Sequence, residues 1–410
     1  MVLLEGTELD DRRGRVWLRP FTHQVGGHAG IMCYDKTTIC KPLVSQEQVF
    51  YESLPADLRP FTAQYKGLIS VYAETDSSGQ LGLVAFSQND NDSLAVQTLA
   101  TKRKHKRGRN GLSEKLLLEE SHFLGKSCHD RSNGCIKVSS FSINLVQDSD
   151  TAYQMEDPNG NKNDIQERNS HNPWGLHCLR TLLSHMTSEF TENKLFRFVL
   201  LENVVSQFHQ PCILDLKMGT RQHGDDASEE KKKRHMKKCE QSTSSSLGLR
   251  LGGMQVYQAK SHHFHCRDKY YGRTLTEEGF QQTLYHFLHD GHRLKKELID
   301  PILQKLLCLK SIIERQGSYR FYSSSLLIIY EGKHQSNSNL GHRKGSPAGY
   351  STEPPPPSTM PKVDVRMIDF AHTTYKGARN NTTTYDGPDL GYIFGLQNLI
   401  HILRKIKDGD

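Results

Sequence analysis

The chain has 410 residues, of which 35% are hydrophobic and 24% charged, and its mean hydropathy is −0.63. No apolar run approaches the roughly 18 residues of a membrane-spanning helix, so the sequence excludes a protein with membrane-spanning helices. The 53 basic residues outnumber the 46 acidic ones and give a formal net charge of +7. This excess favours a polyanionic partner, either a phosphorylated small molecule or a nucleic acid. The length suits one large domain or two lobes with a ligand cleft between them.

The start of the chain and its cysteines indicate a reducing compartment. The first residues, MVLLEGTELDDRRGR, lack the basic start and long apolar stretch of a secretory signal, and we expect residues 1–19 to form a flexible N-terminus. The nine cysteines are scattered, their number is odd, and no CxxC pair occurs. We therefore expect an intracellular protein with free thiols.

The first ordered elements belong to a predicted N-terminal lobe at residues 20–202. Runs of apolar and β-branched residues bounded by turn residues predict strands at Thr37–Cys40 and Gly67–Tyr72. Apolar residues at helical spacing predict a helix over Gln46–Leu54, between these strands. Within this lobe, residues 87–170 are rich in Asn, Asp, Ser, Lys and Gly, which predicts a disordered insertion.

The insertion at residues 87–170 contains the basic run KRKHKRGR, from Lys102 to Arg109. Such a run is typical of a nuclear-targeting or nucleic-acid-binding segment, and equally of a solvated stretch without a partner. We expect the protein in the cytoplasm and the nucleus. A second insertion is expected at residues 333–360, where Pro354–Pro357 gives the composition of a surface linker. Protein partners could bind through either insertion.

The remaining elements follow from caps and periodicity. Asn172 can cap a helix that begins at Pro173 and carries an apolar stripe. The later pattern predicts strands at Leu195–Leu201, Pro211–Leu216, Tyr319–Tyr330 and Val363–Phe370, and helices at Phe280–Leu307 and Gly391–Ile406.

The most informative motif is PCILDLKMG at residues 211–219, which fits the pattern PxxxDxKxG. On a strand, alternate side chains share a face, so Asp215 and Lys217 should project together while Leu214 and Leu216 enter the core. Gly219 permits a sharp turn and close approach of a ligand. An isolated DxK pair is usually a surface salt bridge, so the motif alone does not decide the function.

A basic helix follows this motif. In Lys231–Lys238 the three- and four-residue spacing places Lys231, Arg234 and Lys238 on adjacent turns of one face. Such a face could hold several phosphates. It could also be a solvated basic helix or a nucleic-acid contact.

The stretch LDLKMGTRQHGDDAS resembles the inositol polyphosphate kinase family, and its inositol hexakisphosphate kinase branch in particular. Further similar segments are PFTHQVGGH, CKPL, EQVFYESLP, HNPW, LENVV, YYGR, YRFYSSSLL, VDVRMIDFAH and DGPDLGYIFGL. The resemblance leaves out the two insertions. It implies a two-lobed, kinase-like α+β fold related to protein kinases and ATP-grasp enzymes. ATP would lie between an N-terminal β-rich lobe and a larger C-terminal α+β catalytic lobe at residues 203–410.

The resemblance also assigns nucleotide-binding roles. Lys41 would contact the ATP phosphates, and the inter-lobe hinge at Glu202, Asn203 and Val204 would hold adenine. Asp369 matches the family's metal-binding aspartate, and Mg²⁺ suits its hard carboxylate oxygens together with those of the phosphates. One of the serines at residues 323–325 would support the metal, and the sequence does not say which.

The catalytic and acceptor roles follow in the same way. Asp215 would bind the nucleotide, and Lys217 would bridge the transferred phosphoryl group and the inositol phosphate. The acceptor would be held by Lys217, Arg221, His223, Lys231, Arg234 and Lys238. If the acceptor is inositol hexakisphosphate, its attacking phosphate oxygen is already anionic, so a strong general base is not required. Bringing two polyanions together is then the main barrier, and cations would offset it.

The expected activity is ATP- and Mg²⁺-dependent phosphorylation of inositol hexakisphosphate to a diphosphoinositol phosphate. Three alternatives stay open. An inositol phosphate multikinase or trisphosphate 3-kinase would share PxxxDxKxG and act on ring hydroxyls. A non-catalytic scaffold could bind inositol phosphates without converting them. A nucleic-acid-binding protein is the least supported alternative, because only the two basic runs favour it and no RNP or zinc-finger pattern occurs.

Overall fold

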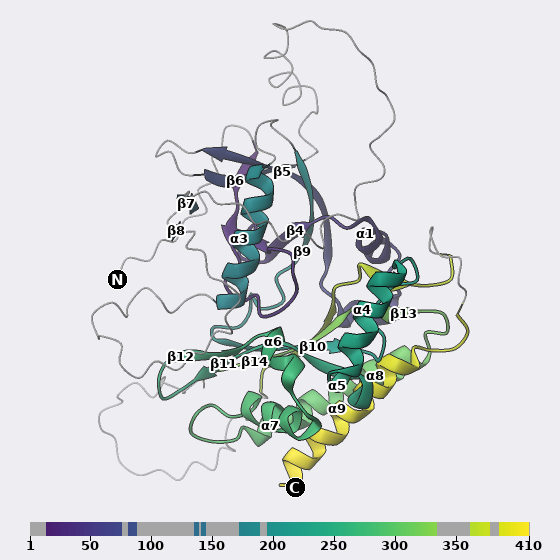
Figure 1. Ribbon diagram of the computed structural model, residues 1–410. Coiled ribbons are helices and arrows are strands. Elements are labelled where there is room, and N and C mark those ends of the chain that lie inside the picture. The colour runs from purple at the N-terminus through teal and green to yellow at the C-terminus, as the bar shows by residue number, and fades with distance from the viewer. Residues whose placement is uncertain are drawn as a thin grey trace, which may run out of the picture.

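The computed structural model describes residues 14–75, 81–87, 135–138, 141–144, 172–188, 195–333, 361–377 and 385–409. Within these residues, two large antiparallel sheets form two lobes, one above the other in Figure 1. One long helix lies on the upper sheet, and the C-terminal helices gather around the lower sheet. The two-lobed α+β fold expected from the sequence is confirmed.

The N-terminal sheet has seven strands in the order β1-β6-β5-β9-β4-β3-β2. Helix α3 (Pro173–Ser188) covers one face, where its leucines share a core with Ile69 and Phe198 of the sheet. The predicted cap is present, because Asn172 Oδ1 accepts a hydrogen bond from the backbone amide of Trp174 at 3.0 Å. The strands are β1 (Arg15–Trp17), β2 (Arg19–Pro20), β3 (Met32–Cys33), β4 (Thr38–Pro42), β5 (Tyr65–Thr75), β6 (Leu81–Ser87) and β9 (Phe196–Glu202).

The C-terminal sheet has five strands in the order β12-β11-β10-β14-β15. Its strands are β10 (Pro211–Met218), β11 (Leu249–Gln258), β12 (His263–Arg267), β14 (Ser325–Glu331) and β15 (Val363–Ile368). The short strands β13 (Arg320–Tyr322) and β16 (His372–Thr374) pair separately. The loop between β9 and β10 connects the two sheets.

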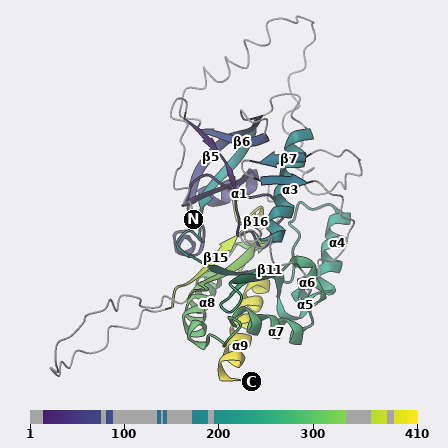
Figure 2. The same ribbon diagram turned by 90° about the vertical axis from the view of Figure 1, so that its left-hand side faces the viewer.

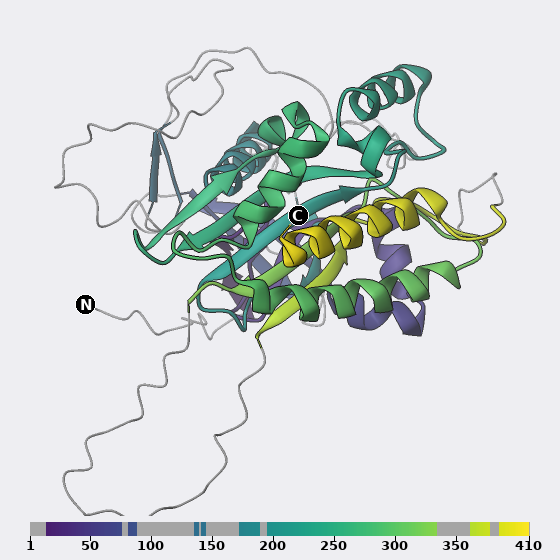
Figure 3. The same cartoon turned by 90° about the horizontal axis from the view of Figure 1, so that it is seen from below.

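Helices surround the C-terminal sheet. Helices α8 and α9 run side by side across the sheet in Figure 3, which shows the molecule from below, and their apolar faces supply much of the larger core. In α9, buried residues recur at three- and four-residue spacing, as expected for a helix with one face on a sheet. The helices are α4 (Glu229–Glu240), α5 (Thr243–Leu247), α6 (Lys269–Thr274), α7 (Glu277–Phe287), α8 (Ile299–Glu314) and α9 (Leu390–Asp408), with the 3₁₀ helix η4 (Lys296–Leu298).

Helix α1 (Ser45–Glu52) and the 3₁₀ helix η1 (Ala56–Phe61) follow β4. Although α1 comes from the N-terminal part of the chain, its Phe50 stacks on Phe370 of the C-terminal part at a centroid distance of 4.1 Å. Figure 2 shows α1 between the two lobes. This helix therefore bridges the lobes on one side.

Two elements predicted as continuous are interrupted. The single helix expected at Phe280–Leu307 is two helices, α7 and α8, separated by a turn in which Gly291 has φ +90°. The strand expected at Tyr319–Tyr330 is divided into β13 and β14, because Ser323 adopts a left-handed backbone with φ +62°. The sequence analysis also missed β6, β11, β12 and α6.

Several expectations concern residues that the structure does not describe. The N-terminal residues up to 13, the basic run at 102–109 and nearly all of the insertion at 333–360 lie outside the described part. Within the insertion at 87–170, the structure describes β7 (Cys135–Val138) and β8 (Phe141–Asn144), which pair as an antiparallel hairpin. The composition of the insertion gave no signal for this hairpin. Among the described helices, none has the length and apolar character needed to cross a membrane.

The two lobes touch through glycines. A Cβ atom on Gly253 of β11 would lie 1.7 Å from the backbone oxygen of Val25, and one on Gly26 would lie 2.1 Å from Oδ2 of Asp215. Both distances are far shorter than van der Waals contact. Residues Gln24–His28, called here the glycine loop, can therefore rest on β10 and β11 only because glycine occupies these positions.

Replacing Gly253 by alanine should destabilise this contact. The added methyl group meets backbone atoms, which cannot move aside as a flexible side chain can, so we expect the free energy of unfolding to fall by about 1–3 kcal/mol. Gly317→Ala is the matched control, because no atom lies within 4 Å of its Cβ position. Urea unfolding of both variants measures the difference, and equal stability of the two would contradict the packing role of Gly253.

Candidate active site

Three charged side chains meet between the two sheets. Asp369, directly after β15, accepts hydrogen bonds from Lys41 Nζ at 3.2 Å through Oδ1 and from Lys217 Nζ at 3.0 Å through Oδ2. Lys41 lies on β4 of the N-terminal sheet, and Lys217 lies on β10 of the C-terminal sheet. Burial alone would raise the pKa of Asp369, but the two ammonium groups lower it well below its ordinary range. The carboxylate therefore stays ionised and links the lobes.

Glu47 of α1 is a further charged member, and the sequence analysis did not identify it. Its side chain is 2% exposed, and its Oε1 lies 2.9 Å from Lys41 Nζ. The same oxygen accepts a hydrogen bond from the backbone amide of Phe370 at 3.3 Å. Glu47 and Asp369 outweigh the effect of burial and raise the pKa of Lys41. Lys41 is therefore held, fully charged, by two carboxylates.

Left-handed backbone occurs at two non-glycine residues of this site. Asp369 has φ +64° and Ser323 has φ +62°. Such conformations are unfavourable for residues with a Cβ atom and persist where the surroundings enforce them. Both residues bind Lys217, because the carbonyl oxygen of Ser323 accepts a second hydrogen bond from its Nζ at 2.9 Å. The unfavourable backbone conformations therefore occur at the two residues that hold Lys217.

Asp215 and Lys217 share one face of β10, as predicted. The unbroken register between β10 and β14 fixes this alternation, and Leu214 and Leu216 enter the main core. Asp215 is 1% exposed beneath the glycine loop. Burial raises its pKa to about 6, although the charge of Lys217 acts in the opposite direction. Asp215 therefore keeps its proton to a higher pH than an ordinary aspartate does.

The three serines considered as metal supports have different surroundings. The hydroxyl of Ser324 donates to the carbonyl oxygen of Phe321 at 2.7 Å, and Ser323 contributes its carbonyl oxygen to Lys217. Ser325 is fully buried and lies opposite Lys217 in the β10–β14 register, with its side chain toward Asp215. Of the three serines, Ser325 is therefore the best placed to support a metal, because its side chain lies among the charged residues of the site.

The predicted hinge lies directly after β9. Glu202 forms an ion pair with Arg366 at 3.2 Å, and the amide of Asn203 donates to the carbonyl oxygen of Thr37 at 2.8 Å. The amide of Val204 makes no hydrogen bond to any residue that the structure describes. The hinge is therefore fixed to β15 and to the residue before β4, and the backbone amide of Val204 remains available as a donor.

Helix α4 turns one edge toward the site. Lys231, His235 and Lys238 are half-buried along this edge, whereas Arg234 is exposed. Burial, reinforced by Lys238 and Lys231, lowers the pKa of His235 to about 4, so this imidazole is neutral between two cations. Lys231, Arg234 and Lys238 were predicted from the sequence. His235, which lies between Lys231 and Lys238 on the same edge, was not. His372 of β16 also lies near Lys231 and was missed.

A group of cations converges beside Lys217 from separate elements. Lys238 of α4, Arg250 of β11 and Lys269 and Arg273 of α6 form what we call the distal cation cluster. Arg250 lies directly opposite Lys217 in the β10–β11 register. Burial and the neighbouring Arg273 lower the pKa of Lys269 to about 8. None of the four forms an ion pair with a carboxylate in the described part of the chain.

Arg221 and His223, the two other predicted acceptor ligands, are less available to bind a phosphate. The guanidinium of Arg221 pairs with Asp225 at 2.6 Å and lies over the ring of Tyr322 at 4.2 Å. Burial and the charge of Arg221 lower the pKa of His223. Arg221 therefore already has a counter-charge and stabilises the segment after Gly219. The roles of Arg221 and His223 as phosphate ligands stay predictions.

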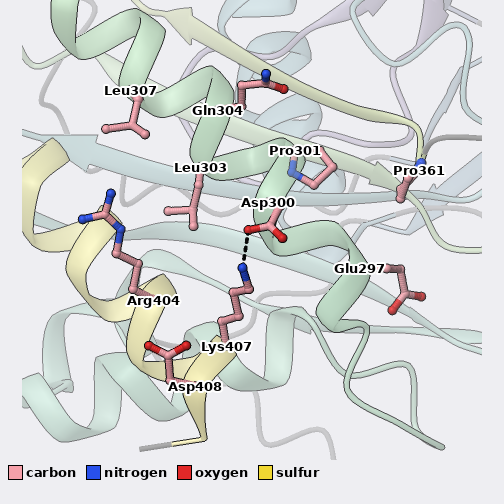
Figure 4. Close-up of a pocket in the computed structure, with 10 residues that line it drawn as sticks. All are labelled: Glu297, Asp300, Pro301, Leu303, Gln304, Leu307, Pro361, Arg404, Lys407 and Asp408. Carbon is pink, nitrogen blue, oxygen red and sulfur yellow. Dashed lines mark hydrogen bonds and ion pairs between the residues drawn. The ribbon is translucent and has the colours of Figure 1, made fainter.

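A separate hollow lies on the C-terminal lobe, between α8 and α9 (Figure 4). Leu303, Leu307 and Arg404 line it, and Lys407 Nζ at its rim pairs with Asp300 at 2.7 Å. No residue of the charged site contributes to this hollow. The hollow is therefore separate from the residues predicted to carry the chemistry.

Comparisons with known proteins identify the family of this chain. A family model described as inositol polyphosphate kinase matches residues 198–404. The chain belongs to the inositol polyphosphate kinase family. It is 50% identical to human inositol hexakisphosphate kinase 3, with 100% of both chains covered. It is 40% identical to human inositol hexakisphosphate kinase 2, covering 98% of this chain and 97% of that relative.

A solved structure is also similar to this chain. The inositol phosphate multikinase of S. cerevisiae, in complex with ADP and Mn²⁺, is 24% identical to this chain. The superposition has a TM-score of 0.40 and covers 52% of this chain and 84% of the multikinase.

Removing the Glu47 carboxylate should destabilise this kinase. Glu47→Ala leaves Lys41 with Asp369 alone and removes the acceptor of the Phe370 amide, so we expect the free energy of unfolding to fall by about 3 kcal/mol. Glu52→Ala on the same helix is the control, because Glu52 is exposed and accepts only surface hydrogen bonds, from Gln48 at 2.8 Å and from the Tyr65 hydroxyl at 3.5 Å. Thermal or urea unfolding compares the two. A loss for Glu47→Ala no larger than that for Glu52→Ala would contradict the structural role of Glu47.

The raised pKa of Asp215 predicts a pH-dependent effect on stability. Because its pKa rises from 3.8 to about 6 on folding, the folded state binds the proton more tightly, and Asp215 destabilises the protein as pH rises through this range. Asp215→Asn should therefore raise the free energy of unfolding by about 2 kcal/mol near neutral pH and much less at about pH 4.5. Urea unfolding at both pH values tests this. A stability change that is independent of pH would refute it, and the surface variant Asp300→Asn should show almost no change.

Proposed function

We propose that this chain is an ATP-dependent inositol hexakisphosphate kinase. A phosphate oxygen of the acceptor attacks the γ-phosphorus of ATP, the bond from that phosphorus to the bridging oxygen breaks, and ADP leaves. The product is a diphosphoinositol pentakisphosphate. The high identity to named inositol hexakisphosphate kinases over nearly the full chain supports this acceptor.

The observation that carries the proposal is the contrast between two neighbouring regions. Lys41 and Lys217 converge on Asp369 between the sheets, while the distal cation cluster beside them forms no salt bridge with a carboxylate among the described residues. A surface with several uncompensated cations binds a polyanion. A site that combines it with paired lysines suits phosphoryl transfer between two polyphosphates.

The residues then take the following roles. Lys41 binds the ATP phosphates, and Lys217 lies between the transferred phosphoryl group and the acceptor. The Val204 amide, with Glu202 and Asn203, forms the adenine-binding hinge, and Asp215 binds the nucleotide beneath the glycine loop. Each lysine also has a second partner, Glu47 for Lys41 and the Ser323 carbonyl for Lys217, so each stays in place when phosphates displace Asp369.

The donor set fits a magnesium ion held jointly with the nucleotide. The side chain of Asp369 is 29% exposed, against 12% for each lysine that binds it, so its oxygens remain accessible. The described residues contain no group of three or more His, Cys, Asp or Glu that could hold a metal alone. Asp369, supported by Ser325, would therefore bind Mg²⁺ together with phosphate oxygens, and the ion would neutralise part of their charge.

The acceptor would lie between α4 and β10. Lys217, Lys231, Arg234, Lys238, Arg221 and His223 are its proposed ligands, and Arg250, Lys269 and Arg273 extend the surface. An acceptor phosphate needs no general base. Asp215, the carboxylate on the same face as Lys217, is 1% exposed, which favours this chemistry over attack by a ring hydroxyl.

We also assign the lobes and the location within this proposal. The end of β9 at Glu202 supports the boundary between the proposed lobes at residues 20–202 and 203–410. The N-terminal lobe begins earlier than proposed, because β1 (Arg15–Trp17) belongs to its sheet. The basic run at residues 102–109 supports a nuclear as well as a cytoplasmic location. The insertions remain the proposed contact points for protein partners.

Product analysis tests the proposed activity. The purified protein with ATP, Mg²⁺ and inositol hexakisphosphate should yield a more highly phosphorylated product. Lys217→Ala should lower the rate by about 100-fold or more, because a cation aimed at the transferred charge is lost. Lys407→Ala, at a residue that lines the hollow in Figure 4, should leave the rate unchanged, because Lys407 lies outside the charged site. Turnover of inositol trisphosphate alone would favour the multikinase alternative, and no turnover of either acceptor would favour the scaffold.

A further inference from the structure

Trp174 joins three parts of the molecule that are far apart in the sequence. It lies in the first turn of α3, is 8% exposed, and its indole Nε1 donates a hydrogen bond to the carbonyl oxygen of Gly27 at 3.2 Å. The ammonium of Lys269 lies over its ring at 4.5 Å, and the ring of Tyr270 contacts it edge-on at 6.1 Å. Figure 1 shows the lower end of α3 above α6. One side chain thus binds the glycine loop and the C-terminal lobe.

The hydrogen bond from Trp174 to Gly27 lies in the part of the site that is proposed to bind the nucleotide. The glycine loop covers Asp215, because Gly26 lies directly against its Oδ2. Gln24 holds the loop from within, donating to the carbonyl oxygens of Gly26 at 3.1 Å and Ala29 at 2.8 Å. Trp174 provides the corresponding contact from outside the loop. Its N–H therefore helps to set the position of the backbone above Asp215.

The contact between Trp174 and Lys269 lies in the part of the site that is proposed to bind the acceptor. Lys269 belongs to the distal cation cluster, and its ammonium has aromatic faces in place of a carboxylate, with Tyr270 at 5.3 Å in addition to Trp174. Aromatic faces attract a cation without neutralising it. The ammonium is thus held at a fixed position and keeps its charge for an anionic ligand.

We propose that Trp174 is a positioning residue that couples the acceptor site to the nucleotide site. Its ring fixes Lys269, its N–H fixes the glycine loop, and a ligand that orders one contact also orders the other. This role rests on the proposed function, because the two ligands are the acceptor and the nucleotide of that reaction. Binding of either ligand should strengthen binding of the other.

Two substitutions separate the two contacts. Trp174→Phe keeps an aromatic face for Lys269 and removes the N–H, so we expect KM for ATP to rise about five- to tenfold and KM for inositol hexakisphosphate to change less than about twofold. Trp174→Leu removes both contacts, and both KM values should rise. A Trp174→Phe variant with unchanged KM for ATP would overturn the role assigned to the N–H. Melting temperatures of the variants identify any loss that comes from unfolding alone.

Binding measurements test the coupling without turnover. The chain has two tryptophans, so in a Trp17→Phe background the emission comes from Trp174 alone. Inositol hexakisphosphate and ADP, each added separately, should change this emission. By calorimetry, saturating inositol hexakisphosphate should tighten the Kd of ADP about fivefold in the parent chain and less than about twofold in Trp174→Leu. Undiminished coupling in Trp174→Leu, or unchanged emission with both ligands, would overturn the proposal.

The outcome for the wild-type chain keeps the two proposals apart. If the wild-type chain does not convert inositol hexakisphosphate, the proposed function fails. If it does, and the Trp174 variants keep both KM values and the coupling, only the role of Trp174 fails. Trp17→Phe, in β1 of the N-terminal sheet, is the control for loss of a tryptophan and should alter neither KM value.

Discussion

The carboxylate of Asp369, placed between the ammonium groups of Lys41 and Lys217, is the interaction on which the rest of the site depends. The two lysines come from different sheets, and like charges brought together in a buried space repel each other. Asp369 supplies the negative charge that allows them to converge. Glu47 extends the same arrangement to α1, and the stacking of Phe50 on Phe370 packs that helix against the end of β15. One electrostatic arrangement thus sets the spacing of the lobes at the site.

The site concentrates features that do not favour folding. Asp215 is a buried carboxylate, Asp369 and Ser323 have left-handed backbones, and the distal cation cluster gathers charges of one sign. The main core around the C-terminal sheet offsets these free-energy costs, because α7, α8 and α9 pack apolar faces against it. Natural proteins commonly depart from local rules at functional sites, where the departure serves binding or chemistry.

The sequence predicted what local patterns and one motif can specify. Strand alternation placed Asp215 and Lys217 on one face, and cap chemistry placed Asn172 at the start of α3. The division of Phe280–Leu307 into two helices was missed although Asp290 and Gly291 form a recognisable turn, in which the Asp290 side chain accepts from the following amides at 2.9 and 3.0 Å. The apolar periodicity on both sides of the turn outweighed this signal.

Residues brought together from distant segments could not be predicted in the same way. Glu47 is buried because Lys41 and Phe370 surround it, and Phe370 lies more than 300 positions away. Arg250, Lys269 and Arg273 come from β11 and α6, two elements that the sequence analysis did not identify. Their convergence depends on sheet register and helix packing, which no local pattern encodes. Lys231–Lys238 was predicted as a helix, but only packing determined which of its side chains face inward.

The uncompensated cations have a consequence for the folded state as a whole. Because Lys238, Arg250, Lys269 and Arg273 repel one another, their cluster costs free energy in the folded chain, and a bound polyanion would offset that cost. A ligand that binds only the folded chain shifts the folding equilibrium toward it by mass action. The amount of such anions in the surroundings would then govern how long the protein persists as well as how fast it works.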